Sequence, residues 1–367
     1  MVKIVQNRSS LEGKEVCFVY AGSRGVGLDS ALALYGTSLK AGYKTRLILS
    51  DDNARADLVA GIYPEAEFYD FSSLGDIRAM RREISGNIAF FTMISPKIIP
   101  LFLEKKAKKI FYFHATYDTS LERQSIGGSA SQAYFNLLHW IAIRNSDLVA
   151  ATQYPLAWQI YARFGKQAMA ITHPPFSCVR EGMFAASTKF DLPRKSGSYF
   201  LDFGGIDRLS KGTELLFKAV SGTGIPTVFA GRTGLELAGG NVSHLPEWLP
   251  DGKLHYLIKN AKCVVAPYLT ASQFSSCAAL AIRLGRPVLA PFSPTFEGWI
   301  ENGKSGLYFS QGDWNDLRGK MQGIMDGQYK FDAGAMQRVE KRMEAKSRQE
   351  LEAAIGSLSG NGKGADA

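Results

Sequence analysis

The sequence has few cysteines, and none of the patterns that would make them structural. No CxxC pair occurs, and three of the four cysteines lie in apolar segments, namely Cys17, Cys263 and Cys277. Such cysteines are typical of buried free thiols in a reducing compartment, which argues against a disulfide-stapled scaffold. No histidines have HxH or HxxxH spacing and no aspartate pair has metal spacing, so we expect no metal site.

Long apolar runs are also missing. The longest candidate, residues 88–103, is interrupted by Pro96, Lys97 and Pro100, and a membrane span needs roughly 20 apolar residues. The first 15 residues lack the apolar core of a signal peptide. We therefore expect a cytoplasmic protein, either soluble or peripheral on the inner face of the membrane.

The composition is that of an ordinary globular protein. With 46% hydrophobic and 21% charged residues, a largely disordered chain is excluded, and 367 residues predict two domains. The net charge of +9 is concentrated at Arg78, Arg81 and Arg82 and again within residues 105–109. These clusters fit either solvated helix faces or attraction to an anionic membrane surface or acidic acceptor. No nucleic-acid-binding motif accompanies them, so we expect no nucleic-acid partner.

Apolar strand patterns alternate with helical patterns along both halves of the chain. In the first half we expect strands at 15–20, 44–49, 88–92, 109–113 and 148–151, and a helix over 29–41 that ends before Gly42. In the second half we expect strands at 199–203, 227–230, 263–266 and 287–290. This alternation predicts βαβ units and a parallel sheet in each half.

These patterns predict an α/β fold of two Rossmann-like domains that face each other across a cleft. We place an N-terminal domain at 1–180 and a linker at 181–198. A C-terminal domain follows at 199–335. A charged helix at 336–355 is expected to cross back to the N-terminal domain, followed by a disordered tail at 356–367. Ligands of open α/β sheets bind at the carboxyl ends of the strands.

A glycine-rich turn, AGSRGVGL at 21–28, separates the first strand from the first helix. Gly25 and Gly27 would let backbone N–H groups approach a phosphate, although such turns also simply pack a strand against a helix. The turn resembles the TGxxxGxG fingerprint of short-chain dehydrogenases. However, Tyr20 and Ala21 replace its Thr and Gly, and no YxxxK pair occurs. An oxidoreductase is therefore the least favoured reading.

Three polar side chains follow strands at positions where a ligand would bind. His114 ends the strand KKIFYF and would donate to a sugar hydroxyl or a phosphate, unless it is simply a satisfied strand-end histidine. After the first strand of the second half, Gly204 opens a loop that carries Arg208 and Lys211. These two cations could clamp a diphosphate, and the alternative is ordinary solvation.

A cluster of serines precedes a helix in the second half. Ser272, Ser275 and Ser276 stand just before CAALAIRLG. Hydroxyls and free N–H groups at a helix start can bind a phosphate, and serines equally serve there as N-caps.

In this order, the segments resemble the family 4 type of glycosyltransferases with the GT-B fold. The resemblance covers most of residues 15–320, and it rests on the order and spacing of the segments, since none is specific alone. The segments that carry it are the glycine turn with LALYGTSLKAGYKTRLIL, FYFHATYD, SDLVAATQYPLAWQIYARFG, GGIDRLSKGTELLFKAV, CVVAPYLTASQFSSCAALAIRLGRPVLAP and WIENGKSGLYF.

The chain departs from that family in the donor site. The family usually carries two glutamates eight positions apart, and in the register fixed by Phe274 and Gly285 these positions are Ser272 and Leu280. The second glutamate normally holds the ribose hydroxyls of the nucleotide, which a leucine cannot do. A basic residue expected directly after Gly204 is absent, and Arg208 is the nearest substitute. Lys211 matches the family pattern.

Glu297 matches an acidic residue that the family often carries near the end of the donor half. The losses leave three readings: an active member with a rearranged donor site, a member with an unusual donor, or a GT-B protein that binds without catalysing.

The resemblance implies a hexosyltransferase that retains the anomeric configuration and acts in cell-surface polysaccharide or glycolipid synthesis. The donor would be a UDP- or GDP-linked sugar, used as co-substrate with no further cofactor and no metal. The acceptor would be a saccharide or a lipid-linked molecule bound by the domain at 1–180, and the domain at 199–335 would bind the sugar nucleotide. Lys211, Arg208 and His114 would be catalytic. Donor binding would fall to Gly25, Gly27, Gly204, Ser272, Phe274, Ser275, Ser276 and Glu297. The alternatives are a catalytically degenerate binding protein and a Rossmann-type NAD(P) oxidoreductase.

Overall fold

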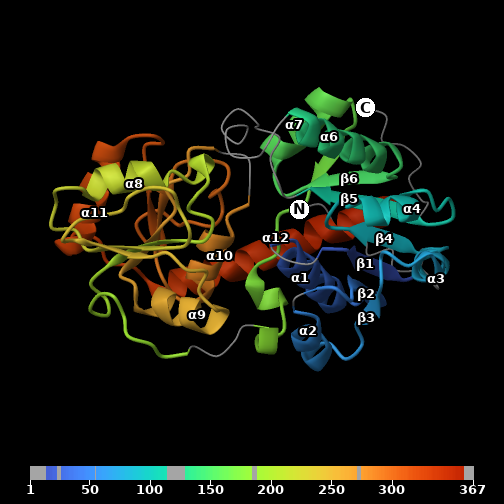
Figure 1. Cartoon of the computed structure of the whole chain (residues 1–367), viewed down its shortest axis with the longest axis horizontal. Helices are drawn as coiled ribbons and strands as arrows, with labels where there is room; N and C mark the ends of the chain where they lie inside the picture. The colour runs from blue at the N-terminus through green and yellow to red at the C-terminus, as the bar shows by residue number, and fades with distance from the viewer. Residues whose placement is uncertain are drawn as a thin grey trace, which may run out of the picture. The chain divides into compact units, whose positions relative to one another are not determined.

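The computed structural model describes residues 14–22, 26–53, 55–113, 129–183, 188–270 and 274–358 (Figure 1). The contacts within the chain form two compact units. The first unit comprises the described residues up to 174 together with 345–358, and the second comprises those in 175–344. Each unit is built around its own sheet.

The sheet of the first unit has seven parallel strands in the order β3-β2-β1-β4-β5-β6-β7. Its central strands are almost wholly buried, because helices cover both faces of a parallel sheet. The strand bounds are β1 Val16–Tyr20, β2 Thr45–Ser50, β3 Glu67–Tyr69, β4 Ile88–Phe91, β5 Lys108–Phe113, β6 Leu148–Ala151 and β7 Ala168–Ala170.

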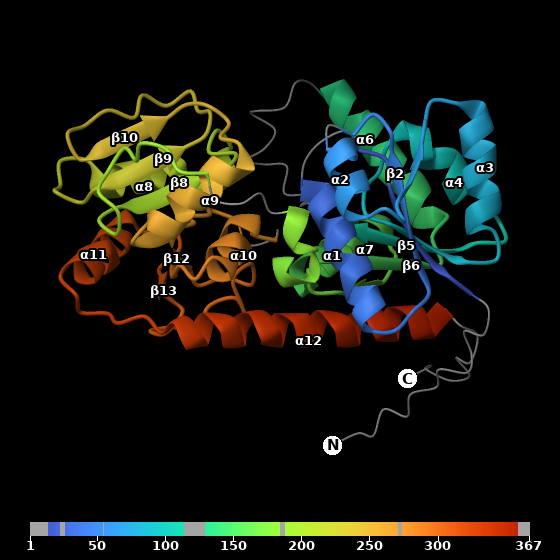
Figure 2. The same ribbon diagram turned by 90° about the horizontal axis from the view of Figure 1, so that it is seen from below.

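The helices of the first unit follow from the strand order. From β1 to β3, successive strands are added toward one edge of the sheet, and from β4 to β7 they are added toward the other edge. Right-handed crossovers therefore place α1 and α2 on one face of the sheet and the later helices on the other face. Figure 2 shows α1 and α2 opposite α3 and α4. The bounds are α1 Val26–Lys40, α2 Ala56–Ile62, α3 Leu74–Ile84, η2 Pro96–Ile98, α4 Ile99–Phe102, α6 Ser129–Arg144 and α7 Tyr154–Phe164.

The second unit repeats this architecture with six parallel strands in the order β10-β9-β8-β11-β12-β13. In its hydrophobic core, sheet residues such as Phe200 and Phe229 pack with Leu216 and Leu317 of the helices. The strands are β8 Phe200–Phe203, β9 Thr227–Ala230, β10 Val242–Leu245, β11 Cys263–Val265, β12 Val288–Pro291 and β13 Gly306–Phe309. The helices are η3 Phe176–Cys178, η4 Glu181–Met183, η5 Leu209–Lys211, α8 Thr213–Val220, α9 Asp251–Asn260, α10 Ser276–Arg283, α11 Trp314–Met325 and α12 Ala333–Leu358.

The structure confirms the predicted α/β fold with two parallel sheets, and all nine predicted strands are present. Helix α12 contributes residues to both units. It ends at Leu358, so residues 356–358 of the expected tail are helical, whereas 359–367 lie outside the described part of the chain.

All four cysteines are free and buried, as expected. Among the described residues, no helix has both the length and the apolar character required to cross a bilayer.

Candidate functional site

Two loops meet at the carboxyl edge of the second sheet. One leaves β8 at Gly204 and runs through η5 to Gly212, and the other leaves β11 at residue 266. Gly212 has φ +69°, and a Cβ there would lie 2.0 Å from the carbonyl oxygen of Pro267, so only glycine fits. The amide of Leu269 donates to the carbonyl of Ser210 at 2.9 Å. These close backbone contacts fix the position of η5 and therefore of Lys211.

Lys211 is the last residue of η5, and its side chain is buried at 7% exposure. The ammonium donates to the hydroxyl of Tyr268, which follows β11. It also lies 3.3 Å from the Sγ of Cys277, in the first turn of α10. The positive charge of Lys211 is thus held at the start of α10, where η5, the loop after β11 and α10 itself meet at the carboxyl edge of the sheet.

Ser275 caps α10 and connects it to Tyr268. Its Oγ accepts from the amide of Ala278 at 3.2 Å and contacts the Tyr268 hydroxyl at 3.1 Å. Within the described residues, the amides of Ser276 and Cys277 have no protein acceptor. The helix start therefore offers free N–H donors and the positive end of the helix dipole next to Lys211.

Asp202 lies beneath this cluster in β8, where it is buried at 2% exposure. Its Oδ2 accepts from the Thr213 hydroxyl at 3.0 Å. Burial raises the pKa of Asp202 to about 7, although the Lys211 charge and the Thr213 hydrogen bond both oppose this shift.

Lys211 itself remains cationic. Burial lowers the pKa of its ammonium, but Cys277, Tyr268 and Asp202 together outweigh burial and raise the pKa above the ordinary lysine value. Burial also raises the pKa of the Tyr268 hydroxyl to about 12, so the hydroxyl is neutral at physiological pH. The net charge next to the start of α10 is positive, which suits an anion.

Three further predicted site residues lie on the same edge, and none of their side chains contacts the Lys211 ammonium. Arg208 begins η5 and is exposed, and its guanidinium has no acceptor among the described residues. Glu297, in the segment after β12, is also exposed. The ring of Phe274 packs against Trp299, with 5.7 Å between ring centroids. These residues surround the Lys211 cluster without being part of it.

Several buried hydroxyls along this edge have no partner in the part of the chain that the structure describes. They belong to Ser210 in η5 and to Ser293 and Thr295 after β12. Buried polar groups are normally hydrogen-bonded, so these hydroxyls indicate where a polar ligand would complete the site.

In the first unit, the glycine-rich turn is tightly packed. A Cβ on Gly22 would lie 2.4 Å from the Tyr20 hydroxyl, and the amide of the Asn53 side chain donates to the Gly22 carbonyl at 2.7 Å. Gly27 is in the first turn of α1. At the end of β7, His173 Nδ1 donates to the Pro174 carbonyl at 2.7 Å, so its Nε2 accepts from Ser30 at 2.7 Å.

The structure thus brings together Gly204, Lys211, Ser275 and Ser276, which the sequence singled out. His114, Gly25 and Ser272 lie outside the described residues. Sequence reasoning missed Asp202, Tyr268 and Cys277. A carboxylate inside the apolar strand FLDF and a tyrosine directly after CVVAP were the available signals.

The described residues hold no group of three or more His, Cys, Asp or Glu side chains that could bind a metal.

No protein-family model matches the chain, and no curated protein matches it either. Solved structures do match. HepE from Anabaena in complex with UDP-glucose is 14% identical, with 94% of this chain and 100% of that chain covered and a TM-score of 0.64. The lipopolysaccharide outer core galactosyltransferase WaaB, in its apo form, is 13% identical, with 94% and 99% covered and a TM-score of 0.58.

Sucrose-phosphate synthase from Thermosynechococcus elongatus is 14% identical, with 95% of this chain and 97% of that chain covered and a TM-score of 0.55. Likeness over nearly the whole length of these chains shows that this chain has their fold. It confirms the GT-B architecture that the order of segments predicted.

Proposed function

We propose that the protein is a glycosyltransferase that moves a hexosyl group from a UDP- or GDP-linked sugar to a saccharide or lipid-linked acceptor. Cell-surface polysaccharide or glycolipid assembly is the expected setting. The observation that carries this proposal is the buried Lys211 ammonium beside the free N–H groups of α10. Similar structures include HepE, solved with UDP-glucose, and WaaB, named as a galactosyltransferase.

The proposed chemistry depends on stabilising a leaving diphosphate. Negative charge grows on the diphosphate as the bond to the sugar C1 breaks, and fixed donors stabilise that charge best. Lys211 supplies a full charge, and the amides of Ser276 and Cys277 supply donors along the helix dipole. Arg208, exposed on the same loop, would bind the outer oxygens. Ser293 and Thr295 would accept or donate hydrogen bonds at the sugar.

Lys211 is tested by Lys211→Met, which removes the charge and keeps most of the volume. Turnover should fall by about 10²-fold or more, the scale for losing one transition-state charge donor. Lys211→Arg retains the charge and should keep more turnover than Lys211→Met. Lys218→Met is the control, because Lys218 is exposed on the neighbouring α8. Equal turnover in folded Lys211→Met and wild type would remove Lys211 from the site.

We propose further that the reaction needs no divalent metal and retains the anomeric configuration. Lys211 and the helix start supply the positive charge that a metal ion would otherwise bring to the diphosphate. EDTA should leave turnover unchanged. Activity that EDTA abolishes and Mg²⁺ or Mn²⁺ restores would contradict metal independence, and an inverted product anomer would contradict retention.

A second candidate is a protein that binds a sugar nucleotide without transferring the sugar. Leu280 favours it, since a leucine in α10 replaces the glutamate that would hold the ribose hydroxyls. Binding of UDP-sugars that raises the melting temperature, with no transfer and no hydrolysis, would support this candidate over the enzyme.

We also propose that the protein acts peripherally on the cytoplasmic face of a membrane. Helices α6 and α7 expose large apolar side chains: Tyr134, Leu137 and Trp140 on α6, and Tyr154, Trp158 and Tyr161 on α7. Neither helix contains an acidic residue, and each has an arginine in its last turn. Exposed tryptophan and tyrosine with cations and no acids suit the interface of an anionic bilayer.

A further inference from the structure

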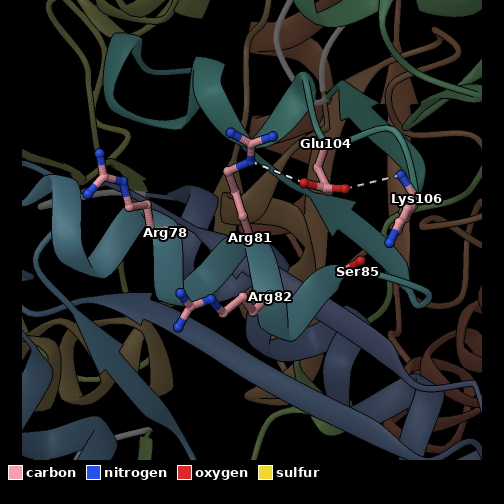
Figure 3. Close-up of a pocket in the computed structure, with 6 residues that line it drawn as sticks. All are labelled: Arg78, Arg81, Arg82, Ser85, Glu104 and Lys106. Carbon is pink, nitrogen blue, oxygen red and sulfur yellow. Dashed lines mark hydrogen bonds and ion pairs between the residues drawn. The ribbon is translucent and has the colours of Figure 1, made fainter.

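A second positively charged site lies in the first unit, away from the ligand edge of either sheet. A cavity of about 310 Å³ opens between α3 and the segment that connects α4 to β5 (Figure 3). Its lining side chains are Arg78, Arg81, Arg82, Ser85, Glu104 and Lys106. Four cations and one carboxylate give this lining a net charge of +3.

The three arginines lie on one face of α3 because of helical spacing, and in Figure 3 only Arg81 extends toward Glu104. Positions 78, 81 and 82 are related by three and four residues, so they share the outer face of α3, while Ile77, Met80 and Ile84 are buried on the other face. Like charges at this spacing repel one another. Arg78 and Arg82 have no acceptor among the residues that the structure describes, and in Figure 3 no dashed line joins either of them to the other side chains drawn.

Glu104 holds parts of the cavity wall in place, but its single negative charge does not cancel the positive charge of the lining. Its carboxylate accepts from Arg81 Nε at 3.1 Å and from the backbone amide of Lys106 at 3.2 Å. This fixes Arg81 and the loop, and among the described residues the two terminal nitrogens of the Arg81 guanidinium have no acceptor. The Lys106 side chain is exposed beside them. A carboxylate that holds one arginine in place, with three further cations lining the same cavity, preorganises part of an anion site.

The cavity is separate from the proposed donor site. It lies where α3 ends before β4 and where the loop enters β5 at Lys108, which is the amino edge of the first sheet. The glycine-rich turn follows the carboxyl end of β1 at the opposite edge, and the Lys211 cluster belongs to the second unit. A ligand at the cavity is therefore not the donor diphosphate of the proposed transfer.

We propose that this cavity binds a phosphate group, carried either by a lipid headgroup or by a small soluble molecule. The guanidinium forks of Arg78, Arg81 and Arg82 match the planar, multidentate geometry in which arginine binds phosphate oxygens. A net charge of +3 matches a phosphate that carries one or two negative charges. Ser85 adds a hydroxyl donor at the cavity wall.

The test compares the double variant Arg78→Gln/Arg82→Gln with the control Lys346→Gln/Arg348→Gln. The control removes the same two charges from exposed positions on α12 in the same unit. The first assay is ³¹P line broadening with inorganic phosphate. The second is sedimentation with phosphatidylcholine vesicles that contain or lack phosphatidylglycerol. Both variants change exposed residues and should fold like the wild type, which circular dichroism verifies.

Loss of two charge-assisted contacts should weaken binding by about tenfold or more in the arginine variant only. A selective loss of phosphate binding supports a soluble ligand, and a selective loss of vesicle binding supports a lipid headgroup. Equal behaviour of the two variants in both assays, or a wild type that binds neither probe, overturns the proposal.

Discussion

At the scale of single residues, the candidate donor site depends on buried groups, and the charge of each group changes the pKa of its neighbours. Lys211 is positive in a buried position because Tyr268 and Cys277 contact its ammonium. Asp202 lies close enough for its pKa to respond to that charge. Removing any one partner leaves a buried polar group without compensation, which is costly.

Asp202 should make stability decrease as the pH rises. Its pKa is raised from 3.8 to about 7 in the folded state, so between these values the folded protein binds more protons than the unfolded chain. The free energy of unfolding then falls with increasing pH, by up to about 1.4 kcal/mol per pH unit. Asp202→Asn keeps an acceptor for Thr213 and should flatten this slope. Urea unfolding across this pH range measures the free energy of unfolding of the wild type and of Asp202→Asn. The same pH dependence in both proteins would contradict the raised pKa of Asp202.

The sequence predicted residues whose role depends on local context and missed those whose role depends on the fold. Gly204, Lys211 and Ser275 stand in recognisable strand–loop–helix positions, where local pattern suffices. Tyr268 and Cys277 become site residues only because β8 and β11 pair, which brings the loop after each strand to the same place. That pairing joins positions more than 60 residues apart along the chain, and no local pattern encodes it.

At the scale of elements, the nine strands predicted from the sequence are the interior strands of the two sheets. The four missed strands, β3, β7, β10 and β13, are the four edges. Interior strands are covered on both faces and so appear as continuous apolar runs, such as VCFVY in β1. The edge strands β3, β7 and β10 are short and mostly half-buried, so they give a weaker apolar signal than interior strands, whereas β13 is mostly buried.

The start of α10 is the element on which the site depends most. Ser275→Ala removes the cap of the Ala278 amide and the contact with Tyr268, and should lower the free energy of unfolding by about 1 kcal/mol. It should also weaken nucleotide binding, since the first turn of α10 would fray. Ser221→Ala is the control, because Ser221 is exposed at the end of α8 and lies outside the site. Denaturant unfolding and nucleotide titration measure the two effects, and identical values for both variants would argue against this role.

At the scale of the whole molecule, the order of segments predicted the architecture even though no single motif was specific. Two sheets, each with its strands parallel and its loops gathered at one edge, follow from repeated βαβ units. The surface was less predictable, because the sequence indicated the basic clusters but not the aromatic faces of α6 and α7. Those faces depend on which side of each helix the sheet covers.

Membrane binding should depend on the aromatic faces. Trp158 is 67% exposed on α7, and Trp158→Ser should reduce partitioning into anionic vesicles by about tenfold, the effect expected for losing one large interfacial side chain. Trp248→Ser is the matched control, because Trp248 is 69% exposed in the second unit. Vesicle sedimentation measures the effect. Equal losses in both variants would show that the α7 face has no particular role.

A crystal structure of the protein with bound UDP would test the donor site most directly. The account predicts diphosphate oxygens within hydrogen-bond distance of the Lys211 ammonium and of the Ser276 and Cys277 amides. A diphosphate bound anywhere else on the chain, with the start of α10 empty, would contradict it.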